Sequence, residues 1–343
     1  MEQLRMELGA NSYDIFLGDG LLEQAGALLR LDRRVLIVTD EGVPADYAQR
    51  LAAQCAAPFI VCLPQGEGTK SLAMFQLLLE RMLNAGFTRT DCVAAVGGGV
   101  VGDLAGFAAA CYMRGIDFYN IPTTALSQID SSIGGKVAVN LGGVKNIVGA
   151  FYQPRRVLVD PQLLSTLPPR QLASGLAEAI KAGVVADEPL LALFEQTDAR
   201  AQMQEVLLRA LRFKKQIVEQ DERESGPRKL LNFGHTIGHG IESVCGLGGL
   251  LHGECVGLGM LPMCTTPQLR RRVEAVLEKY GLPTRVSFDP DAVFAALTHD
   301  KKAAGNTLTI VSAAQAGKAA LQQVPLESLR VLLEKEAKEG IGR

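Results

Sequence analysis

Three of the protein's four histidines lie in one short stretch of the sequence: His235, His239 and His252. On a helix, residues four apart such as His235 and His239 share one face, with Cβ atoms roughly 5 to 6 Å apart. A glycine-rich turn at 246–249 lets the chain fold back toward them before His252. Because neutral imidazole is the commonest metal ligand among side chains, this spacing favours a divalent metal site. Two buried histidines bonded to backbone carbonyls would give the same pattern.

A carboxylate is the expected third ligand, because a catalytic zinc-type site uses three protein ligands and leaves one position open. Glu178 lies in a helical pattern rich in Ala, Gly and Ile, where an unpaired carboxylate is costly to bury. Lys181 follows three residues later on the same face. The alternative interpretation is a simple Glu178–Lys181 ion pair at helix spacing, worth about 0.2 to 0.5 kcal/mol.

A glycine-rich stretch predicts a second binding site. Residues 97–103 read GGGVVGD and satisfy G-x-G-x-x-G between a strand pattern and a helix pattern. Such glycines let backbone amides approach a pyrophosphate, and the helix start adds roughly 0.3 to 1 kcal/mol for a nearby anion. A tight strand-to-helix turn is the alternative. The acidic residue expected about 20 residues later is met only loosely by Asp117, which argues against an ordinary dehydrogenase fold.

The segment from Pro122 to Pro154 combines polar residues with Ile, Val and Gly, which indicates buried polar groups rather than a solvated loop. Buried polar groups need partners, and a phosphate or a sugar would supply them. Arg114 could join these residues, although a surface arginine at a helix end is the alternative. The suitable donors to phosphate oxygens are Lys136, Lys145 and Asn146.

The elements that must hold these residues differ between the two halves of the chain. Apolar β-branched runs at 35–40, 59–64, 91–96 and 117–122 alternate with helical patterns, which predicts βαβ units and a parallel sheet. Asp40 and residues 64–68 follow strand ends, where open α/β sheets bind ligands. After Pro168 the predicted elements are helices at 170–185, 199–220, 229–244, 253–263 and 268–280, a strand pair at 307–312 and 319–324, and a charged terminal helix.

We therefore expect an α/β N-terminal domain with a Rossmann-like parallel sheet at 1–165, and a mainly α-helical C-terminal domain at 166–343. A length of 343 residues fits two domains. A net charge of -2 gives no basic face for nucleic acid or an anionic membrane.

The remaining composition predicts a cytoplasmic protein. The seven cysteines contain no CxxC pair, so we interpret them as reduced, buried thiols. The start of the chain lacks the pattern of a signal peptide. Glycines interrupt the most apolar stretch, 92–113, so we expect no membrane span.

Taken together and in order, several motifs resemble those of the 3-dehydroquinate synthase family of sugar-phosphate cyclases, over nearly the whole chain. They are GEGTKS (66–71), GGGVVGD (97–103), PTT (122–124), QIDSSIGGK (128–136), KN (145–146), GLAEAIK (175–181), ERESGPRKLLNFGHTIGHGIE (222–242), LHGE (251–254) and DKK (300–302). The resemblance implies an NAD- and metal-dependent carbon–oxygen lyase of the shikimate pathway, in aromatic amino acid biosynthesis. Its reaction converts 3-deoxy-D-arabino-heptulosonate 7-phosphate to 3-dehydroquinate and phosphate.

The resemblance also implies roles for individual residues. Zinc or cobalt would bind Glu178, His235 and His252, whereas His239 would face the substrate. The implied NAD contacts are Asp40, Glu67, Lys70, Gly98, Gly99, Asp103, Thr123, Thr124, Asp130 and Lys145. The implied catalytic residues are Lys136, Lys181, Asn232 and His239, and the implied substrate contacts are Arg114, Asn146, Lys214, Arg228 and Lys302. Arg114 would come from the neighbouring subunit of a homodimer.

Two features depart from the family pattern, and three other functions compete with the implied one. LGGVKN stands where many members carry a His-Pro-type loop, and Gly240 replaces an alanine. A cyclase whose heptulose phosphate lacks a carboxylate, such as an epi-valiolone or deoxy-inosose synthase, is disfavoured because Lys214 and Arg228 would hold that carboxylate. A metal-dependent alcohol dehydrogenase of glycerol type needs no phosphate cluster. A non-enzymatic nucleotide-binding module needs no set of metal ligands.

Overall fold

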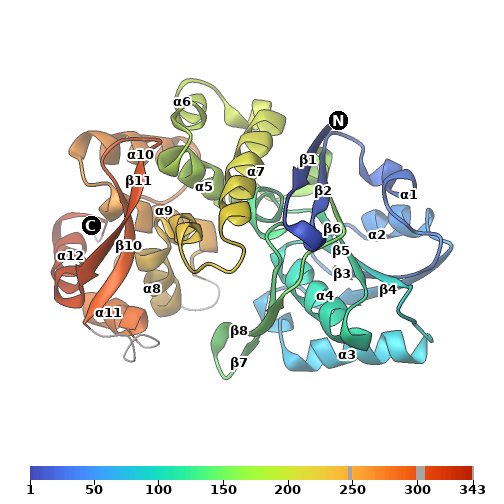
Figure 1. Ribbon diagram of the computed structural model, residues 1–343. Coiled ribbons are helices and arrows are strands. Elements are labelled where there is room, and N and C mark those ends of the chain that lie inside the picture. Colours follow the sequence, from blue (N-terminus) through green and yellow to red (C-terminus); the bar gives the residue numbers. More distant parts are fainter. Residues whose placement is uncertain (246–248, 299–305, 342–343) are drawn as a thin grey trace. The chain divides into compact units, whose positions relative to one another are not determined.

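The computed structural model describes residues 1–245, 249–298 and 306–341. The chain divides into two compact units, Met1–Leu167 and Pro168–Arg343. Each unit has its own secondary structure (Figure 1). Lys302, one of the predicted substrate contacts, lies outside the described residues.

The first unit is built on a seven-stranded sheet with the order β1-β2-β9-β6-β5-β3-β4. Every neighbouring pair is parallel except β1 and β2, which are antiparallel. The predicted Rossmann-like parallel sheet is therefore confirmed, with one antiparallel edge strand added. The strands are β1 (Glu2–Met6), β2 (Tyr13–Leu17), β3 (Arg34–Asp40), β4 (Ala57–Leu63), β5 (Cys92–Gly97), β6 (Asp117–Pro122) and β9 (Arg156–Val159).

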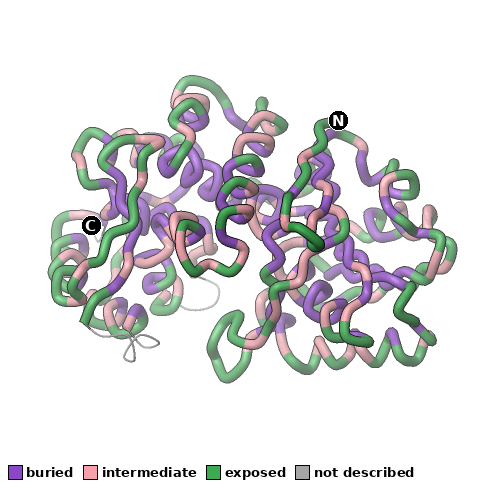
Figure 2. The backbone as a smooth tube through the Cα atoms, in the orientation of Figure 1, coloured by how far each residue is buried: buried purple, intermediate pink, exposed green. Residues whose placement is uncertain are grey.

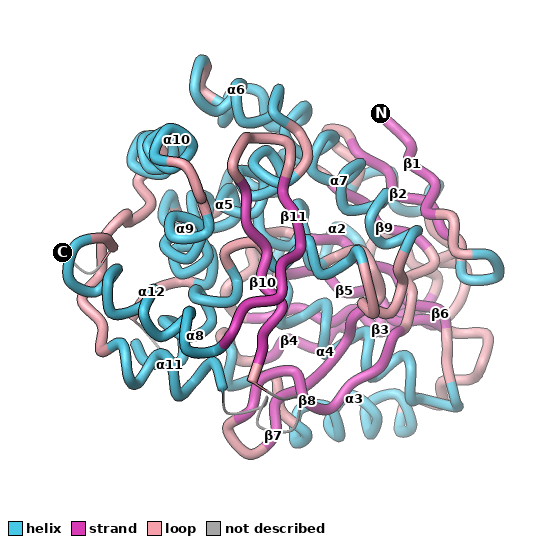
Figure 3. The backbone as a smooth tube through the Cα atoms, turned by 60° about the vertical axis from the view of Figure 1, so that its left-hand side comes forward, coloured by secondary structure: helices cyan, strands magenta, loops and turns pink. Residues whose placement is uncertain are grey.

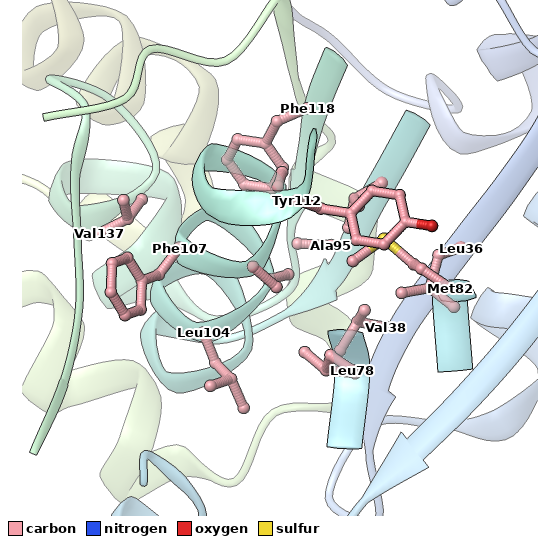
Figure 4. Close-up of a cluster of buried hydrophobic side chains, with 14 of the residues drawn as sticks. Leu36, Val38, Leu78, Met82, Ala95, Leu104, Phe107, Tyr112, Phe118 and Val137 are labelled. Atoms are coloured by element: carbon pink, nitrogen blue, oxygen red, sulfur yellow. The ribbon is translucent and has the colours of Figure 1, made fainter. Parts of the chain in front are cut away.

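Helices cover both faces of this sheet because successive side chains of a strand point to opposite faces. In β3, Leu36 and Val38 join a core cluster with Phe107 of α4 (Figure 4), whereas Ile37 joins a second cluster with Tyr47 of α2. Burial on both faces explains why the inner strands β3 and β5 read as apolar runs. The helices are α1 (Ala25–Leu28), α2 (Ala45–Ala52), α3 (Leu72–Asn84) and α4 (Gly99–Cys111).

An antiparallel hairpin, β7 (Lys136–Leu141) and β8 (Val144–Phe151), forms from the polar stretch that follows the sheet strand β6. The sequence did not predict it. Its turn is only two residues long, Gly142 and Gly143, with φ angles of 60° and 81°, and a two-residue hairpin turn with positive φ at both positions favours glycine. Its tip is exposed (Figure 2).

The second unit is mainly α-helical, as predicted, with one antiparallel ribbon of β10 (Thr307–Ala313) and β11 (Ala319–Pro325) (Figure 3). Its helices are α5 (Pro169–Val185), α6 (Glu188–Gln196), α7 (Met203–Gln220), α8 (His235–Cys245), α9 (His252–Met263), α10 (Pro267–Lys279), α11 (Pro290–Thr298) and α12 (Leu326–Glu339). Helices α6 and α11 were not predicted. Short helical segments complete both units: η1 (Gly9–Asn11), η2 (Leu22–Gln24), η3 (Glu67–Thr69), η4 (Tyr112–Arg114), η5 (Ser127–Ser131), η6 (Pro161–Thr166), η7 (Ala199–Gln202) and η8 (Pro227–Asn232).

The predicted helix at 229–244 is wrong as a single element. Segment η8 ends at Asn232, and α8 starts at His235. Gly234 between them has a φ of 78°, in the left-handed region that a continuing right-handed helix excludes. The break therefore makes His235 the first residue of its helix.

Glycines bring α9 into direct backbone contact with α5 and α8. A Cβ atom on Gly253 would lie 1.8 Å from the Ser174 carbonyl oxygen in α5, and one on Gly259 would lie 2.0 Å from the Gly234 carbonyl oxygen. Gly253 N also donates a hydrogen bond of 3.1 Å to Ser174 Oγ. Helix α9 can approach its neighbours this closely only because these positions lack side chains.

A carboxylate organises the loop between α7 and η8. Asp221 accepts hydrogen bonds from the backbone amides of Ser225 (2.9 Å), Gly226 (2.7 Å) and Arg228 (3.1 Å). Burial alone would raise the pKa of this carboxyl, but the amides outweigh burial and lower the pKa from 3.8 to about 2. The charged form of Asp221 therefore holds the backbone of Arg228 in place.

The cysteines and the helix lengths bear on two further expectations. None of the seven cysteines forms a disulfide, but Cys62 and Cys111 are exposed, so the prediction that the thiols are buried is wrong for these two. Cys62 lies on β4, the strand at one edge of the sheet, whose side chains are mostly exposed. Among the described residues, no helix combines the length and the apolar character needed to cross a bilayer.

We expect Gly253→Ala to destabilise the protein by about 1 to 3 kcal/mol. The new methyl group would overlap the backbone of Ser174, which cannot move aside as a flexible side chain can. Gly257→Ala in the same helix is the matched control, since its Cβ would first meet the mobile end of Leu277 at 3.2 Å. Urea unfolding monitored by circular dichroism measures both changes. Equal free energies of unfolding for the two variants would contradict the proposed packing.

We expect the stability lost in Asp221→Asn to depend on pH. A carboxyl whose pKa is lower in the folded state stabilises the fold above its unfolded pKa, and this contribution disappears as the pH falls through the folded pKa. The deficit of the variant should therefore be full at neutral pH and shrink as the pH falls from 3.8 toward about 2. Urea unfolding across this range measures it. A deficit that stays constant would rule out the role of the charged carboxylate.

Candidate active site

A buried carboxylate in the middle of α5 is the centre of the histidine cluster. Glu178 Oε1 lies 3.4 Å from His235 Nε2 and 3.6 Å from His252 Nε2. Its other oxygen, Oε2, forms an ion pair with Lys181, so the alternative helix-spaced pair is present as well. The Glu178 side chain is 1% exposed, and within the described ranges neither oxygen accepts a hydrogen bond of standard geometry. A buried carboxylate whose oxygens accept no such hydrogen bond is suited to bind a cation.

Two imidazole rings are held so that the same kind of nitrogen faces Glu178. His235 Nδ1 lies 3.2 Å from the Phe233 carbonyl oxygen, and His252 Nδ1 lies 3.1 Å from Glu242 Oε2. These acceptors favour a proton on Nδ1 of each ring, so Nε2 is the nitrogen that faces Glu178 and that can bind a metal when it carries no proton. Hydrogen bonding of the second ring nitrogen is what orients metal-ligating histidines.

The separations between these donor atoms fit a tetrahedral metal ion. Bonds of about 2.0 to 2.2 Å to nitrogen and oxygen place neighbouring ligands of a tetrahedron roughly 3.3 to 3.5 Å apart. The two imidazole nitrogens lie 3.4 and 3.6 Å from Glu178 Oε1. Glu178, His235 and His252 could therefore hold a divalent ion with little rearrangement.

His239 belongs to the same cluster but differs in exposure. Its ring centroid lies 5.1 Å from that of His235 and 5.5 Å from that of His252. One nitrogen from each of the three rings lies within 4.8 Å of the others, so a three-histidine metal site is also geometrically possible. His239 is exposed, whereas the other two rings are partly buried. Exposure suits a group that meets a substrate.

The charges of the cluster depend on one another. Burial would raise the pKa of Glu178, but Lys181 and the two imidazoles outweigh burial and hold it well below its usual value. Burial, helped by Lys181, lowers the pKa of His235 to about 3. Burial also disfavours a charged His252, but Glu178 and Glu242 raise its pKa to about 9. A metal ion at His252 would therefore displace a proton.

The predicted substrate contacts of this unit lie in α7 and η8, the two elements that precede α8 in the chain. Arg228 and Asn232 belong to η8, which packs against α5 and α7, and Lys214 belongs to α7. Arg228 is 2% exposed and Lys214 is 7% exposed. Asn232 Nδ2 donates a 2.8 Å hydrogen bond to Glu224 Oε1. Two buried cations on packed elements favour an anionic ligand.

In the first unit, the predicted cofactor residues gather at one edge of the sheet. They follow the carboxyl ends of four adjacent parallel strands, β4, β3, β5 and β6, which is where open α/β sheets bind nucleotides. Gly98 precedes the first residue of α4, Gly99, so the amides at this helix start are placed as the motif predicts. The residues are Glu67 and Lys70 after β4, Asp40 at the end of β3, Gly98 and Gly99 after β5, and Thr123 and Thr124 after β6.

The remaining predicted residues of this unit lie around Lys70 and the hairpin. The buried Lys70 ammonium donates to Asp103 and to Asn146 Oδ1. Lys136, Lys145 and Asn146 are exposed on the hairpin, so the prediction that the polar groups of this stretch are buried is wrong for these three. Asp130 lies in η5, a π-helical turn, and such turns occur frequently at functional sites. Arg114 is exposed in a turn with a φ of 69°.

Sequence reasoning missed Glu242, which holds the Nδ1 atom of His252. The available signal was its spacing, because His235, His239 and Glu242 are at positions i, i+4 and i+7 of one helix and therefore share one face. It also missed Arg170, whose Nε and Nη2 atoms bind both carboxylate oxygens of Glu254 at 2.7 and 2.8 Å near the start of α9.

Known solved structures resemble this chain over nearly its full length. One is a 2-deoxy-scyllo-inosose synthase in complex with carbaglucose-6-phosphate, NAD⁺ and Co²⁺, with a TM-score of 0.87, 26% identity, and coverage of 97% of this chain and 99% of the other. Another is a 2-epi-5-epi-valiolone synthase from Streptomyces hygroscopicus with NAD⁺ and Zn²⁺, with a TM-score of 0.86, 29% identity, and coverage of 98% and 99%. A probable glycerol dehydrogenase from Sinorhizobium meliloti shares the fold, at a TM-score of 0.61 and 17% identity.

Sequence comparisons are more specific. The 3-dehydroquinate synthase from Streptococcus sanguinis is 39% identical and that from Enterococcus faecalis is 40% identical, each over 97% of this chain and 99 to 100% of the relative. The family model for the 3-dehydroquinate synthase N-terminal region matches residues 60–174, and the model for the C-terminal region matches residues 175–303. The chain therefore belongs to the 3-dehydroquinate synthase family.

Proposed function

We propose that this protein is a 3-dehydroquinate synthase, which converts 3-deoxy-D-arabino-heptulosonate 7-phosphate to 3-dehydroquinate and phosphate. The observation that carries this proposal is the match to relatives of that name over 97% of the chain. In the proposed reaction the substrate is transiently oxidised, loses phosphate, is reduced again and closes its ring by an intramolecular aldol step. The enzyme is then a carbon–oxygen lyase of the shikimate pathway.

The proposed metal ligands are Glu178, His235 and His252, and the ion is zinc or cobalt. Their converging donor atoms support this assignment, and two related cyclases bind Co²⁺ or Zn²⁺. A bound ion would supply Lewis acidity at a substrate hydroxyl. Lys181 keeps Glu178 ionised in its buried position. The exposed His239 then transfers protons at the substrate, and Asn232 orients a hydroxyl.

The proposed NAD site is the carboxyl edge of the sheet in the first unit, and this unit is the proposed NAD-binding domain. NAD⁺ in two related cyclase structures supports it. Bound NAD would accept a hydride and return it to the same substrate. Amides at the start of α4 bind the pyrophosphate, Asp40, Glu67 and Lys70 bind outer parts of the cofactor, and Lys136 and Asn146 receive the substrate phosphate.

The buried cations Arg228 and Lys214 support this function over those of the related cyclases. A hydrogen bond between a cation and a carboxylate is worth about 1.5 to 3 kcal/mol, so these residues favour a substrate that carries a carboxylate. The substrate of the proposed reaction has one. The resemblance to dehydrogenases of glycerol type concerns the fold alone, at 17% identity.

Four further properties belong to the proposal, three by family resemblance and the cytoplasmic location from the composition. The protein acts as a homodimer in the cytoplasm, and Arg114 contributes to the substrate phosphate site of the neighbouring subunit. The exposure of Arg114 supports this role. Lys302 completes the phosphate site.

We expect the purified protein, given catalytic NAD and zinc or cobalt, to release inorganic phosphate from the heptulosonate phosphate without net formation of NADH. A heptulose phosphate that lacks the carboxylate should be a poorer substrate by roughly 10- to 100-fold in kcat/KM, the equivalent of one charge-assisted hydrogen bond. Faster phosphate release from the second substrate would identify a different cyclase. Net accumulation of NADH would identify a dehydrogenase.

We expect Glu242→Ala to weaken metal binding by roughly 10- to 100-fold, because His252 loses the acceptor that orients its ring. Glu242→Gln should retain most of the affinity, since its amide oxygen can still accept from Nδ1. Ser243→Ala, on the same helix and exposed, is the control. Chelator competition with the apoprotein measures all three. Wild-type affinity in Glu242→Ala would contradict the role of this hydrogen bond.

A further inference from the structure

Asn140 connects two segments that are separate in the sequence, the loop after β4 and the β7–β8 hairpin. Its side-chain Nδ2 donates to Glu67 Oε1 at 2.8 Å, and its Oδ1 accepts from the backbone amide of Asn146 at 2.8 Å. Its own backbone amide donates to the Lys70 carbonyl oxygen at 2.8 Å. One partly buried residue therefore ties the loop after β4 to both strands of the hairpin.

The tight hairpin turn makes this connection possible. Leu141 pairs with Val144 across the two-residue turn, and the register shifts between Val139 and Leu141. Asn140 lies at this irregularity, so its side chain reaches Asn146 of the opposite strand. Asn146 has a φ of 57°, a conformation that costs energy for a residue other than glycine. The bond from its amide to Asn140 helps to hold it there.

The two ends of this connection carry different ligands in the proposed function. Glu67 and Lys70 are proposed NAD contacts, and Asn146 is a proposed phosphate contact. Lys70 Nζ also donates to Asn146 Oδ1 and to Asp103. The cofactor residues and the phosphate residue are thus parts of one hydrogen-bonded network, and Asn140 contacts three of its members.

We propose that Asn140 is a positioning residue that couples NAD binding to phosphate binding, an inference that rests on the proposed function. Either ligand orders the network on its side of Asn140, so the second ligand binds to residues that are already ordered. Such coupling is reciprocal: NAD tightens phosphate binding by the same factor as phosphate tightens NAD binding.

The chemistry at this position requires an amide. Glu67 needs a donor and the Asn146 amide needs an acceptor, and a carboxamide presents one of each. In Asn140→Asp the acceptor remains, but the donor to Glu67 is replaced by a second negative charge. In Asn140→Ala both contacts are lost. The two variants therefore separate the contact with Glu67, on the cofactor side, from the contact with Asn146, on the phosphate side.

The test is calorimetric titration of the metal-loaded full-length protein with NAD and with inorganic phosphate, each alone and in the presence of the other. In the wild type we expect NAD to tighten phosphate binding roughly fivefold or more. Asn140→Ala should lose this coupling factor. Asn140→Asp should weaken NAD binding more than phosphate binding. Val144→Ala, at an exposed position of the same hairpin, should retain both affinities and the coupling.

Thermal melting of each variant separates this role from a merely structural one. A structural role would lower the melting temperature and weaken both affinities alike while the coupling factor stays at its wild-type value, and that result would overturn the inference. A wild type that binds both ligands without coupling would also overturn it and leave the proposed function intact. A wild type that binds no NAD would overturn the proposed function and this inference with it.

Discussion

The close approach of helix α9 to helices α5 and α8 is the constraint on which the candidate metal site depends. Glu178, His235 and His252 come from three different helices, and their donor atoms lie within 3.4 to 3.6 Å of the Glu178 carboxylate. This requires backbone contact at Gly253 and Gly259, where any side chain would overlap a neighbouring carbonyl group. The packing of these three helices therefore also fixes the distances between the candidate metal ligands.

The same packing buries the negative charge of Glu178, which interacts with Lys181 on one side and with the imidazoles on the other. One oxygen of Glu178 pairs with Lys181 and the other faces the imidazoles. Sequence reasoning treated the ion pair and the metal ligand as alternatives, but a carboxylate has two oxygens and can serve both. The lysine compensates a carboxylate that burial would otherwise neutralise, so Glu178 stays charged and ready to bind a cation.

The sequence predicted most of the sheet and of the helical unit because their signals are local. Strands β3, β4 and β5 contain apolar runs, β6 is mainly apolar around Asn120, and His235 and His239 have helix spacing. The break at Gly234 was missed because a single glycine is compatible with a helical pattern, and only the contact with α9 requires it. The contacts of Asn140 and the hairpin that carries it depend on a two-residue turn inside a segment for which the sequence predicted buried polar groups but no strands. Glu242 has the helix spacing of the cluster, but its role depends on a contact with His252 of another helix, which the sequence does not reveal.

The central claim is that the metal ligands are one carboxylate and two imidazoles, although three imidazoles are within reach. X-ray absorption at the zinc edge of the protein loaded with one equivalent of zinc tests this most directly. Outer-shell scattering from imidazole carbons counts the coordinated rings. The account predicts two rings, with oxygen completing the shell, and the same spectrum for His239→Ala. Three rings in the wild type, with one lost in His239→Ala, would contradict it.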